Sequence, residues 1–521
     1  MSLMKKFASV GGATMASRVL GFVREAMIGG MLGAGPVADA FYAAFRFPNL
    51  FRRIFAEGAF NTAFIPLFAK EVEKDGQAAA RDFAEDVLAF LVAALLVVSA
   101  VAMIFTPLLV STVIAPKFAD TPAKFDLTVT LTRIMFPYLF AMSLLAMLSG
   151  ILNSLRRYFL AALAPVLLNA LMILALIGAR NAGADAAATG LWLSWGVMVS
   201  GFAQVALAWW GVRREGFSIG LRLPRLTPGV KRLVVLMGPA VVTGGVTQIN
   251  LLVGQIIASA QDGAIALLNY ADRINQLPLG VIGVAIGVVL LPELSRALKA
   301  GDSREAQHLQ NRSLEFGLAL TLPAAAGLMV FPGPIVALIY ERGAFTPETT
   351  AMTSAALAAF ASGLPAYVLA KVFQPAYFAR EDTRTPLWFS VVNVAVNIAL
   401  SLVFFPVYGH VAIAAATSVG AWVNAVLLAL GLWSHGHYRP SPETVRRVVM
   451  IILSTSVMAV VLWGMASLLS AWLAGSFWVR LVTTTAIIIV AALVYFAAAI
   501  LSGGLDRSEI ARLARRRRAK G

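Results

Sequence analysis

Long apolar stretches recur along almost the whole chain, from Phe7 to Leu501. A helix needs about 20 apolar residues to cross the hydrocarbon core of a bilayer. By that measure we predict about fourteen membrane-spanning helices, at residues 7–35, 39–69, 84–115, 126–153, 158–179, 187–211, 230–260, 270–295, 314–340, 350–379, 386–406, 410–433, 446–470 and 478–501. The predicted fold class is therefore an all-α polytopic membrane protein.

Composition excludes the main alternatives to this class. The 521 residues are 59% hydrophobic and only 13% charged, whereas about a quarter of a soluble domain is charged. The chain has no cysteine, which excludes disulfides, thiolate metal sites and a cysteine nucleophile. No phosphate-binding loop, histidine metal cluster or serine nucleophile motif is found, so we expect neither an enzyme nor a metalloprotein.

The positive charges predict the orientation of the chain. With both termini in the cytoplasm, 29 of the 42 lysines and arginines fall in cytoplasmic segments and 5 in outside loops, namely Lys117, Lys124, Arg180, Arg342 and Arg480. Such a bias is typical of membrane proteins, whose cytoplasmic loops are rich in lysine and arginine. It accounts for the net charge of +16 without nucleic acid as a partner, and we interpret the basic end of the chain as a topogenic or lipid-binding tail.

The chain also contains an internal repeat. Short matches recur at a nearly constant offset: Ala38-Asp39 with Ala271-Asp272, Pro107 with Pro332, Pro137 with Pro365, and Asn169 with Asn397. A repeat of six helices keeps its orientation, so the two copies are parallel, as in many transporters. We predict a six-helix bundle at 1–215, a cytoplasmic linker at 216–229, a second bundle at 230–440, two additional helices at 441–501 and a cytoplasmic tail at 502–521.

Charged residues within the predicted spans are the strongest functional signal, because each one is costly in a bilayer. The first two predicted spans are unusually rich in them, with Arg18, Arg24, Glu25, Asp39, Arg46, Arg52, Arg53 and Glu57, while the eighth adds Asp272 and Arg273 near its start and the tenth adds Lys371. Acids are too few to neutralise this set. Since the planar guanidinium suits phosphate, we expect an anionic cargo in a water-filled cavity.

Helical spacing groups these residues. Ser17 and Arg24 share one face of the first predicted helix, and Asn49, Arg53 and Glu57 share a face of the second. For Arg18, Arg24 and Arg52 we favour a role in the cavity. For Arg46 and Arg53, pairing with an acid such as Glu57 is an equal alternative.

Three stretches of the chain resemble those of a known family. The stretches Arg18-Val-Leu-Gly-Phe-Val-Arg24-Glu25, Pro48-Asn-Leu-Phe-Arg-Arg-Ile-Phe-Ala-Glu-Gly-Ala-Phe-Asn61 and Tyr270-Ala-Asp-Arg273 are similar to those of the MurJ (MviN) lipid II flippases. That family belongs to the superfamily of the MATE exporters and polysaccharide flippases. The resemblance covers essentially the whole chain.

The resemblance implies a function: transfer of polyprenyl-pyrophosphate-linked peptidoglycan precursor, lipid II, to the outer leaflet of the bacterial cytoplasmic membrane. It implies that the substrate contacts Arg18, Arg24, Arg52, Arg273, Ser17, Glu25 and Asn49, supported by Asp39, Arg53, Glu57, Asp272 and Lys371. The last two helices resemble those that form a groove for the lipid tail. Membrane lipids are further partners, and association with the cell-wall synthesis machinery stays open.

One departure from the family concerns sodium. Some members bind it through an acid on the seventh helix, where this chain offers Asn250 but no acid. Asn393, Asn397 and Thr417 would supply further oxygens, yet hydrogen bonding between helices explains these residues equally well. We expect no organic cofactor, and dependence of transport on the membrane potential or on a monovalent ion stays open.

Three other functions fit parts of this pattern. A MATE-type exporter of cationic drugs would need an acidic cavity. A flippase for another polyprenyl-pyrophosphate-linked glycan has the same charge requirement, and only the motif at Pro48–Asn61 and the additional helix pair argue against it. An integral-membrane glycosyltransferase would need catalytic acids, for which Asp39 and Asp272 alone are a weak basis.

Overall fold

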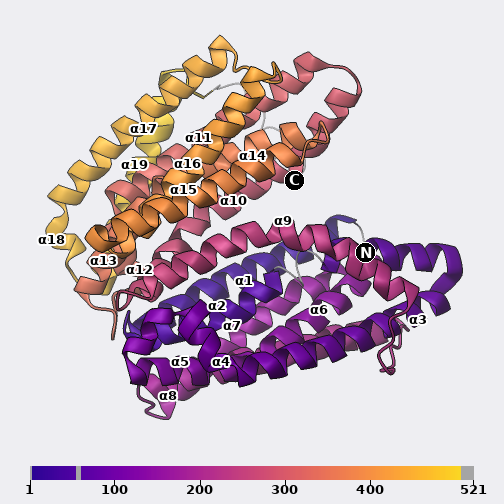
Figure 1. The fold of residues 1–521 in the computed structure, drawn as a ribbon. Helices are drawn as coiled ribbons and strands as arrows, with labels where there is room; N and C mark the ends of the chain where they lie inside the picture. Colours follow the sequence, from indigo (N-terminus) through magenta and orange to yellow (C-terminus); the bar gives the residue numbers. More distant parts are fainter. Residues whose placement is uncertain (1–2, 54–59, 506–521) are drawn as a thin grey trace. The chain divides into compact units, whose positions relative to one another are not determined.

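The computed structural model describes residues 3–53 and 60–505, which form helices joined by short connections (Figure 1). The chain divides into two compact units. The first contains the residues up to Ala266 together with Arg342–Phe345, and the second contains Leu267–Glu341 and the residues from Thr346 onward. Each unit is described by itself.

The first unit is built from helices that pack side by side, with α8 packed against both α6 and α7. Helix α7 packs against both α1 and α8, and α3 packs against α6 and α9. Its elements are α1 (Leu3–Leu32), α2 (Pro36–Phe51), α3 (Asn61–Ile104), α4 (Thr106–Leu109), the π-helix η2 (Val110–Ile114), the 3-10 helix η3 (Pro116–Asp120), α5 (Pro122–Met135), α6 (Pro137–Ser154), α7 (Tyr158–Asn181), α8 (Ala186–Arg214) and α9 (Pro228–Ala258).

The second unit repeats this pattern and adds a helix pair. Helix α15 packs against α16, α11 packs against α14, and α17 packs against α11 and α19. Its elements are α10 (Ala264–Lys299), whose first residues belong to the first unit, α11 (Ser303–Val330), α12 (Pro332–Tyr340), α13 (Pro347–Ala361), α14 (Leu364–Phe378), α15 (Arg384–Tyr408), α16 (His410–Ser434), α17 (Pro442–Leu468), α18 (Ser470–Leu473) and α19 (Phe477–Leu501).

The helices agree with a polytopic membrane protein. Among the described residues, ten helices or helix pairs are long and apolar enough to span a bilayer. The other four predicted spans overlap α1, α2, α9 and α10, of which α1, α2 and α10 carry charges discussed above. The fold is therefore consistent with fourteen spans.

Corresponding helix breaks support the internal repeat. The predicted span at 84–115 breaks before α4, which has Pro107 in its first turn, and the span at 314–340 breaks before α12, which begins at Pro332. The span at 126–153 divides at Pro137 into α5 and α6, and the span at 350–379 divides just before Pro365 into α13 and α14. Because proline lacks an amide hydrogen, it is tolerated in the first turn of a new helix. Both units thus break their helices at matched prolines.

The described parts of the predicted second span, 39–69, belong to two helices, α2 and α3, on either side of residues 54–59, which lie outside the described residues. Pro48 lacks the amide hydrogen that would bond to Ala44, and α2 ends one turn later at Phe51. Residues 61–69 instead open α3, which continues through the predicted loop at 70–83 to Ile104. The structure therefore places only a single-residue break where a cytoplasmic loop was predicted.

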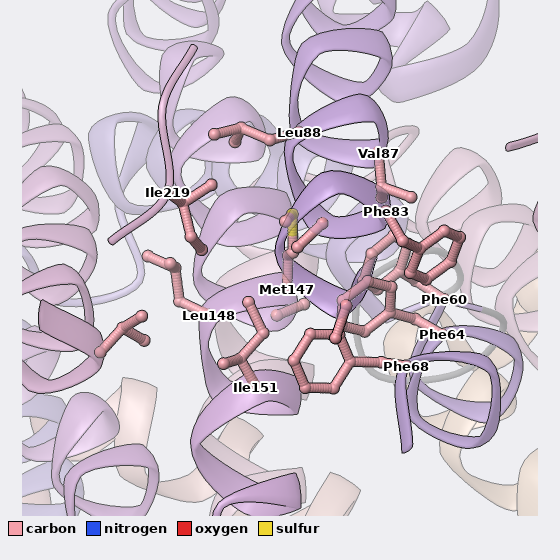
Figure 2. Packing of buried hydrophobic residues seen from close by; sticks show 14 of the residues in the cluster. Phe60, Phe64, Phe68, Phe83, Val87, Leu88, Met147, Leu148, Ile151 and Ile219 are labelled. Carbon is pink, nitrogen blue, oxygen red and sulfur yellow. The ribbon is translucent and has the colours of Figure 1, made fainter. Parts of the chain in front are cut away.

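That break is at Gly76, whose backbone has φ 82° and ψ −178°. Only glycine adopts this conformation readily. The rings of Phe64 and Phe83 stack with their centroids 5.9 Å apart, although a straight helix would hold these two residues about 28 Å apart. Helix α3 therefore folds back on itself, and Figure 2 shows the phenylalanines of both arms packed with Met147 and Ile151 of α6.

The compact units differ from the predicted bundles. Helix α9 lies within the predicted second bundle, 230–440, yet it packs on α3, with Val230 and Leu233 buried in the same cluster as Phe83. The division of packing falls at Ala266 rather than in the linker at 216–229. The predicted boundaries follow the internal repeat, whereas the compact units follow packing. The units therefore do not test the boundaries, which stay a prediction.

The last two membrane helices are fastened to the second unit at both ends. Near one end, Arg480 in the first turn of α19 pairs with Glu341 at 2.9 Å. Near the other, Arg447 of α17 pairs with Glu315 of α11 at 2.8 Å. Between these pairs the Tyr495 hydroxyl donates to the carbonyl of Ala319 at 2.5 Å. Arg480, which we expected in an outside loop, thus serves to dock α19.

Candidate functional site

The first helix carries a buried charged network. Arg24 and Glu25 expose only 6% and 2% of their surface, and they form an ion pair. A second nitrogen of Arg24 donates to Oδ1 of Asn169 on α7 at 2.8 Å, and the hydroxyl of Tyr42 on α2 donates to the Glu25 carboxylate at 2.6 Å. Three helices therefore meet at one ion pair, which keeps both charges compensated in a medium where an unpaired charge is costly.

Ser17 belongs to the same network. The side-chain amide of Asn169 donates to the carbonyl oxygen of Ser17 at 2.8 Å and contacts its hydroxyl at 3.3 Å. Gly21 lies between Ser17 and Arg24, and a Cβ there would lie 3.4 Å from the Asn169 nitrogen. The Asn169 side chain thus packs directly on α1 at Gly21 and bridges both residues. The structure confirms that these residues share one helix face, but Arg24 faces an acid and an amide rather than open space.

Arg18 differs from Arg24 in its surroundings. It is exposed, and within residues 3–53 and 60–505 it makes no ion pair or hydrogen bond. A cation in a membrane helix without a protein partner needs water or an anion. Arg18 is therefore available to bind an anionic group.

Helix α2 supplies the next arginines. The Nε of Arg52 donates to Oδ1 of Asn49 at 2.8 Å, and both side chains are half-buried. Arg46 is half-buried and Arg53 exposed. Glu57, the expected partner of Arg53, lies outside the described residues. The contact with Asn49 holds the Arg52 side chain at the end of α2.

Asp39 is not part of this network. Its carboxylate is fully buried, accepts from Nζ of Lys124 at 2.8 Å, and accepts from the backbone amides of Gly263 and Ala266 at 2.7 and 3.0 Å. It therefore caps the first turn of α10 from a different helix. Lys124 also contacts Asp262 at 2.9 Å. The role of Asp39 is thus structural in this arrangement.

The second unit contributes the remaining predicted residues. Asp272, Arg273 and Lys371 are all half-buried, on α10 and α14. Gln276 donates a short hydrogen bond to Asp272 one turn away. These side chains keep part of their surface accessible, unlike Arg24 and Glu25.

The polar residues considered for sodium pack two helices together. Oδ1 of Asn397 on α15 accepts from Thr417 of α16 at 3.4 Å and from Ser401 at 3.3 Å. A Cβ on Gly420 would lie 2.4 Å from Oδ1 of Asn393, so α15 and α16 approach closely there. Asn250 is half-buried on α9 in the other unit. Among the described residues, no group of three or more histidines or acids is arranged to hold a metal ion.

Comparison with known proteins identifies the family. The family model described as lipid II flippase MurJ matches residues 28–483. The chain belongs to the MurJ family. A probable lipid II flippase MurJ of Rhizobium tropici is 55% identical over 88% of this chain and 86% of its own. The lipid II flippase MurJ of Burkholderia cenocepacia is 37% identical over 88% of this chain and 89% of its own.

Solved structures agree with this assignment. A lipid II flippase MurJ in an inward closed conformation matches with a TM-score of 0.78 and 25% identity, over 94% of this chain and 98% of that one. An inward-facing multidrug resistance MATE transporter matches with a TM-score of 0.66 and 15% identity, over 82% of this chain and 97% of that one. The second likeness concerns the fold alone.

Sequence reasoning missed three residues of these networks. Lys124 was assigned to an outside loop, Asn169 was noted only as a repeat match, and Tyr42 was not singled out. Asn169 carried a usable signal, since an amide within an apolar helix needs a hydrogen-bonding partner. The sequence gives no such signal for Lys124 or Tyr42, because their partners lie on other helices.

Proposed function

We propose that this chain moves lipid II from the inner to the outer leaflet of the bacterial cytoplasmic membrane. Membership of the MurJ family supports the cargo, and the accessible cations support the mode of binding. The observation that carries the proposal is Arg18, an exposed cation without a protein partner among the described residues, on the same helix as the buried Arg24. Arg52 on α2 and Arg273 on α10 are further guanidinium groups of the kind that binds phosphate.

Transport by alternating access requires that these contacts form and break. A charge-assisted hydrogen bond to the pyrophosphate contributes about 1.5–3 kcal/mol, so each arginine adds roughly tenfold or more in affinity. Because release outside needs the same contacts to open, a change of conformation must weaken them. Arg24 enters substrate binding only when a contact to Asn169 or Glu25 is exchanged for one to the substrate.

The last two helices fit a groove for the polyprenyl tail. Their outer surface is apolar, with Val460, Trp463 and Leu493 more than 60% exposed. The charged residues Arg447 and Arg480 are already paired with acids. Such a surface solvates a hydrocarbon chain and offers little to a pyrophosphate.

We further propose that both termini are cytoplasmic and that transport draws on the membrane potential or a monovalent ion. A reporter active only outside the cytoplasm, fused after Gly521, should give no signal. Ionophores that abolish each gradient separately should identify the energy source. Association with the cell-wall synthesis machinery belongs to the same proposal, and co-purification from the native host would test it.

The decisive experiment is depletion in the native host, where lipid-linked peptidoglycan precursor should accumulate in the inner leaflet. Accumulation of a different polyprenyl-linked glycan would overturn the proposal. Arg18→Ala and Arg273→Ala should each fail to complement while the protein still reaches the membrane. Arg296→Ala is the matched control, since among the described residues this exposed arginine pairs only with Glu293 one turn away. Arg447→Ala would be a poor control because Arg447 bridges Glu315 and Glu443.

A further inference from the structure

The connection between α8 and α9 is an extended segment fastened to α3. The backbone amide of Gly220 donates to the Glu85 carboxylate at 2.7 Å. Arg222 pairs with Asp82 at 2.6 Å and with Glu85 at 2.5 Å. These ion pairs raise the pKa of Arg222, chiefly through the hydrogen bond to Asp82. The segment is thus fixed at the level of the acids on α3.

Beyond this anchor the segment forms one wall of a groove. Pro224, Arg225 and Leu226 face five apolar side chains of α3 between Phe90 and Val98, and the space between them has a volume of about 470 Å³. Along α3, Val98 lies about 20 Å from Glu85. The groove therefore runs from the polar anchor along the apolar part of the helix.

The α3 wall has the character of a lipid-facing surface. The apolar part of α3 has the highest mean hydropathy, 3.0, of the ten candidate spans, and only 22% of that window is buried. Val97 and Val98 are 63% and 47% exposed, and Leu223 and Leu226 of the segment are 79% and 61% exposed. Acyl chains are the natural neighbours of such side chains in a bilayer.

Arg225 is the polar exception in this groove. It is exposed, and within the described chain it makes no ion pair or hydrogen bond. Its neighbours in the groove are apolar, so its guanidinium needs water or an anion. At the end of α8, Arg213 and Arg214 lie over the rings of Trp209 and Trp210, and tryptophans and arginines of this kind are enriched at the headgroup level of a membrane.

From these observations we propose that the groove binds one anionic phospholipid of the phosphatidylglycerol class. The phosphate contacts the guanidinium of Arg225, and one acyl chain lies along α3 from Phe90 to Val98. A guanidinium fits a phosphate through two parallel hydrogen bonds. A zwitterionic phospholipid brings its own cation to the same place, so the site discriminates by charge.

Photocrosslinking tests the site directly. The full-length protein, with Leu226 replaced by the photoreactive benzoylphenylalanine, is reconstituted in nanodiscs of equal phosphatidylglycerol and phosphatidylcholine. The crosslinked lipid is then identified by mass spectrometry. One arginine near an anionic headgroup is worth about 1 kcal/mol, so we expect phosphatidylglycerol to be enriched about fivefold. Equal crosslinking of both lipids would overturn the proposal.

Variants at Arg225 separate this site from a general attraction to basic loops. Arg225→Ala should reduce the enrichment to near one, Arg225→Lys should keep most of it, and Arg225→Glu should favour phosphatidylcholine. Arg296→Ala, at another exposed arginine, should change nothing. Enrichment that survives Arg225→Ala would contradict the site. Crosslinking of added lipid II in preference to phosphatidylglycerol would also contradict it, since the occupant would then be a polyprenyl chain.

Discussion

Asn169 in the first unit and Asn397 in the second occupy matched positions of the internal repeat, yet they serve different partners. Asn169 links Arg24 to Ser17 and so holds one end of a buried ion pair. Asn397 accepts hydrogen bonds from Thr417 and Ser401, which are neutral. The same amide thus supports charge in one copy and helix packing in the other.

The two asparagines have different partners because matched residues differ between the two copies of the repeat. At the same offset that relates Asp39 to Asp272, Arg24-Glu25 corresponds to Ile257-Ala258. Both of these apolar side chains are buried, at 9% and 1% exposed. Only the first copy of the repeat therefore contains this buried ion pair.

The largest expected effect comes from breaking the ion pair. Arg24→Ala leaves Glu25 charged and buried, which should cost about 3–5 kcal/mol of unfolding free energy. Thermal unfolding of the purified protein measures the loss. The double variant Arg24→Ile with Glu25→Ala imports the residues of the second copy, and it should recover most of the stability but no transport. Transport by the double variant would show that the pair is merely structural.

The two asparagines give the most direct test. Asn169→Ala removes a bond to a charged group and a bond to the Ser17 carbonyl, and we expect a loss of about 3 kcal/mol. Asn397→Ala removes two long bonds between neutral groups, and we expect about 1 kcal/mol. Thermal unfolding of both variants under one set of conditions measures the difference. Equal losses of unfolding free energy would contradict the different roles of Asn169 and Asn397.

Tyr42→Phe should have a smaller effect than Asn169→Ala. It removes one hydrogen bond to the Glu25 carboxylate and leaves the ion pair intact, so about 1.5 kcal/mol of unfolding free energy should be lost. In the double variant that lacks both Arg24 and Glu25, the same substitution should change little. A full loss there would mean that the hydroxyl acts through another partner.

The smallest expected effect is a pH dependence in the second unit. Contacts among Asn397, Thr417 and Ser401 contain no titratable group, so acid sensitivity must come from elsewhere. The carboxylate of Asp382 accepts from the backbone amides of Thr385 at 3.0 Å and Arg384 at 3.1 Å, which lowers its pKa below the ordinary 3.8. Its stabilising effect is therefore complete above that value and is lost as the pH falls through the lower folded pKa. Unfolding temperatures of Asp382→Asn and the parent should differ at neutral pH and converge once the pH has fallen below the folded pKa.

The sequence predicted the long helices well and their partners poorly. Apolar runs located the spans because burial in lipid imposes length and hydropathy on each one separately. The single-residue break at Gly76 escaped prediction, since a glycine among charged residues is equally typical of a loop. The pairing of Asp39 with Lys124 could not be predicted either. The two residues lie on helices far apart in the sequence, and neither residue type indicates which helix it contacts.

The stacking of Phe64 on Phe83 across Gly76 bears on the order in which the chain folds during synthesis. Both rings belong to α3 and lie close together in the sequence, so this contact loses little loop entropy and closes soon after both residues emerge from the ribosome. Phe217, which meets Phe68, lies much further along the chain, beyond α8. We therefore expect the two arms of α3, whose packing is shown in Figure 2, to come together first, and α6 and then the segment around Phe217 to pack onto them as translation proceeds.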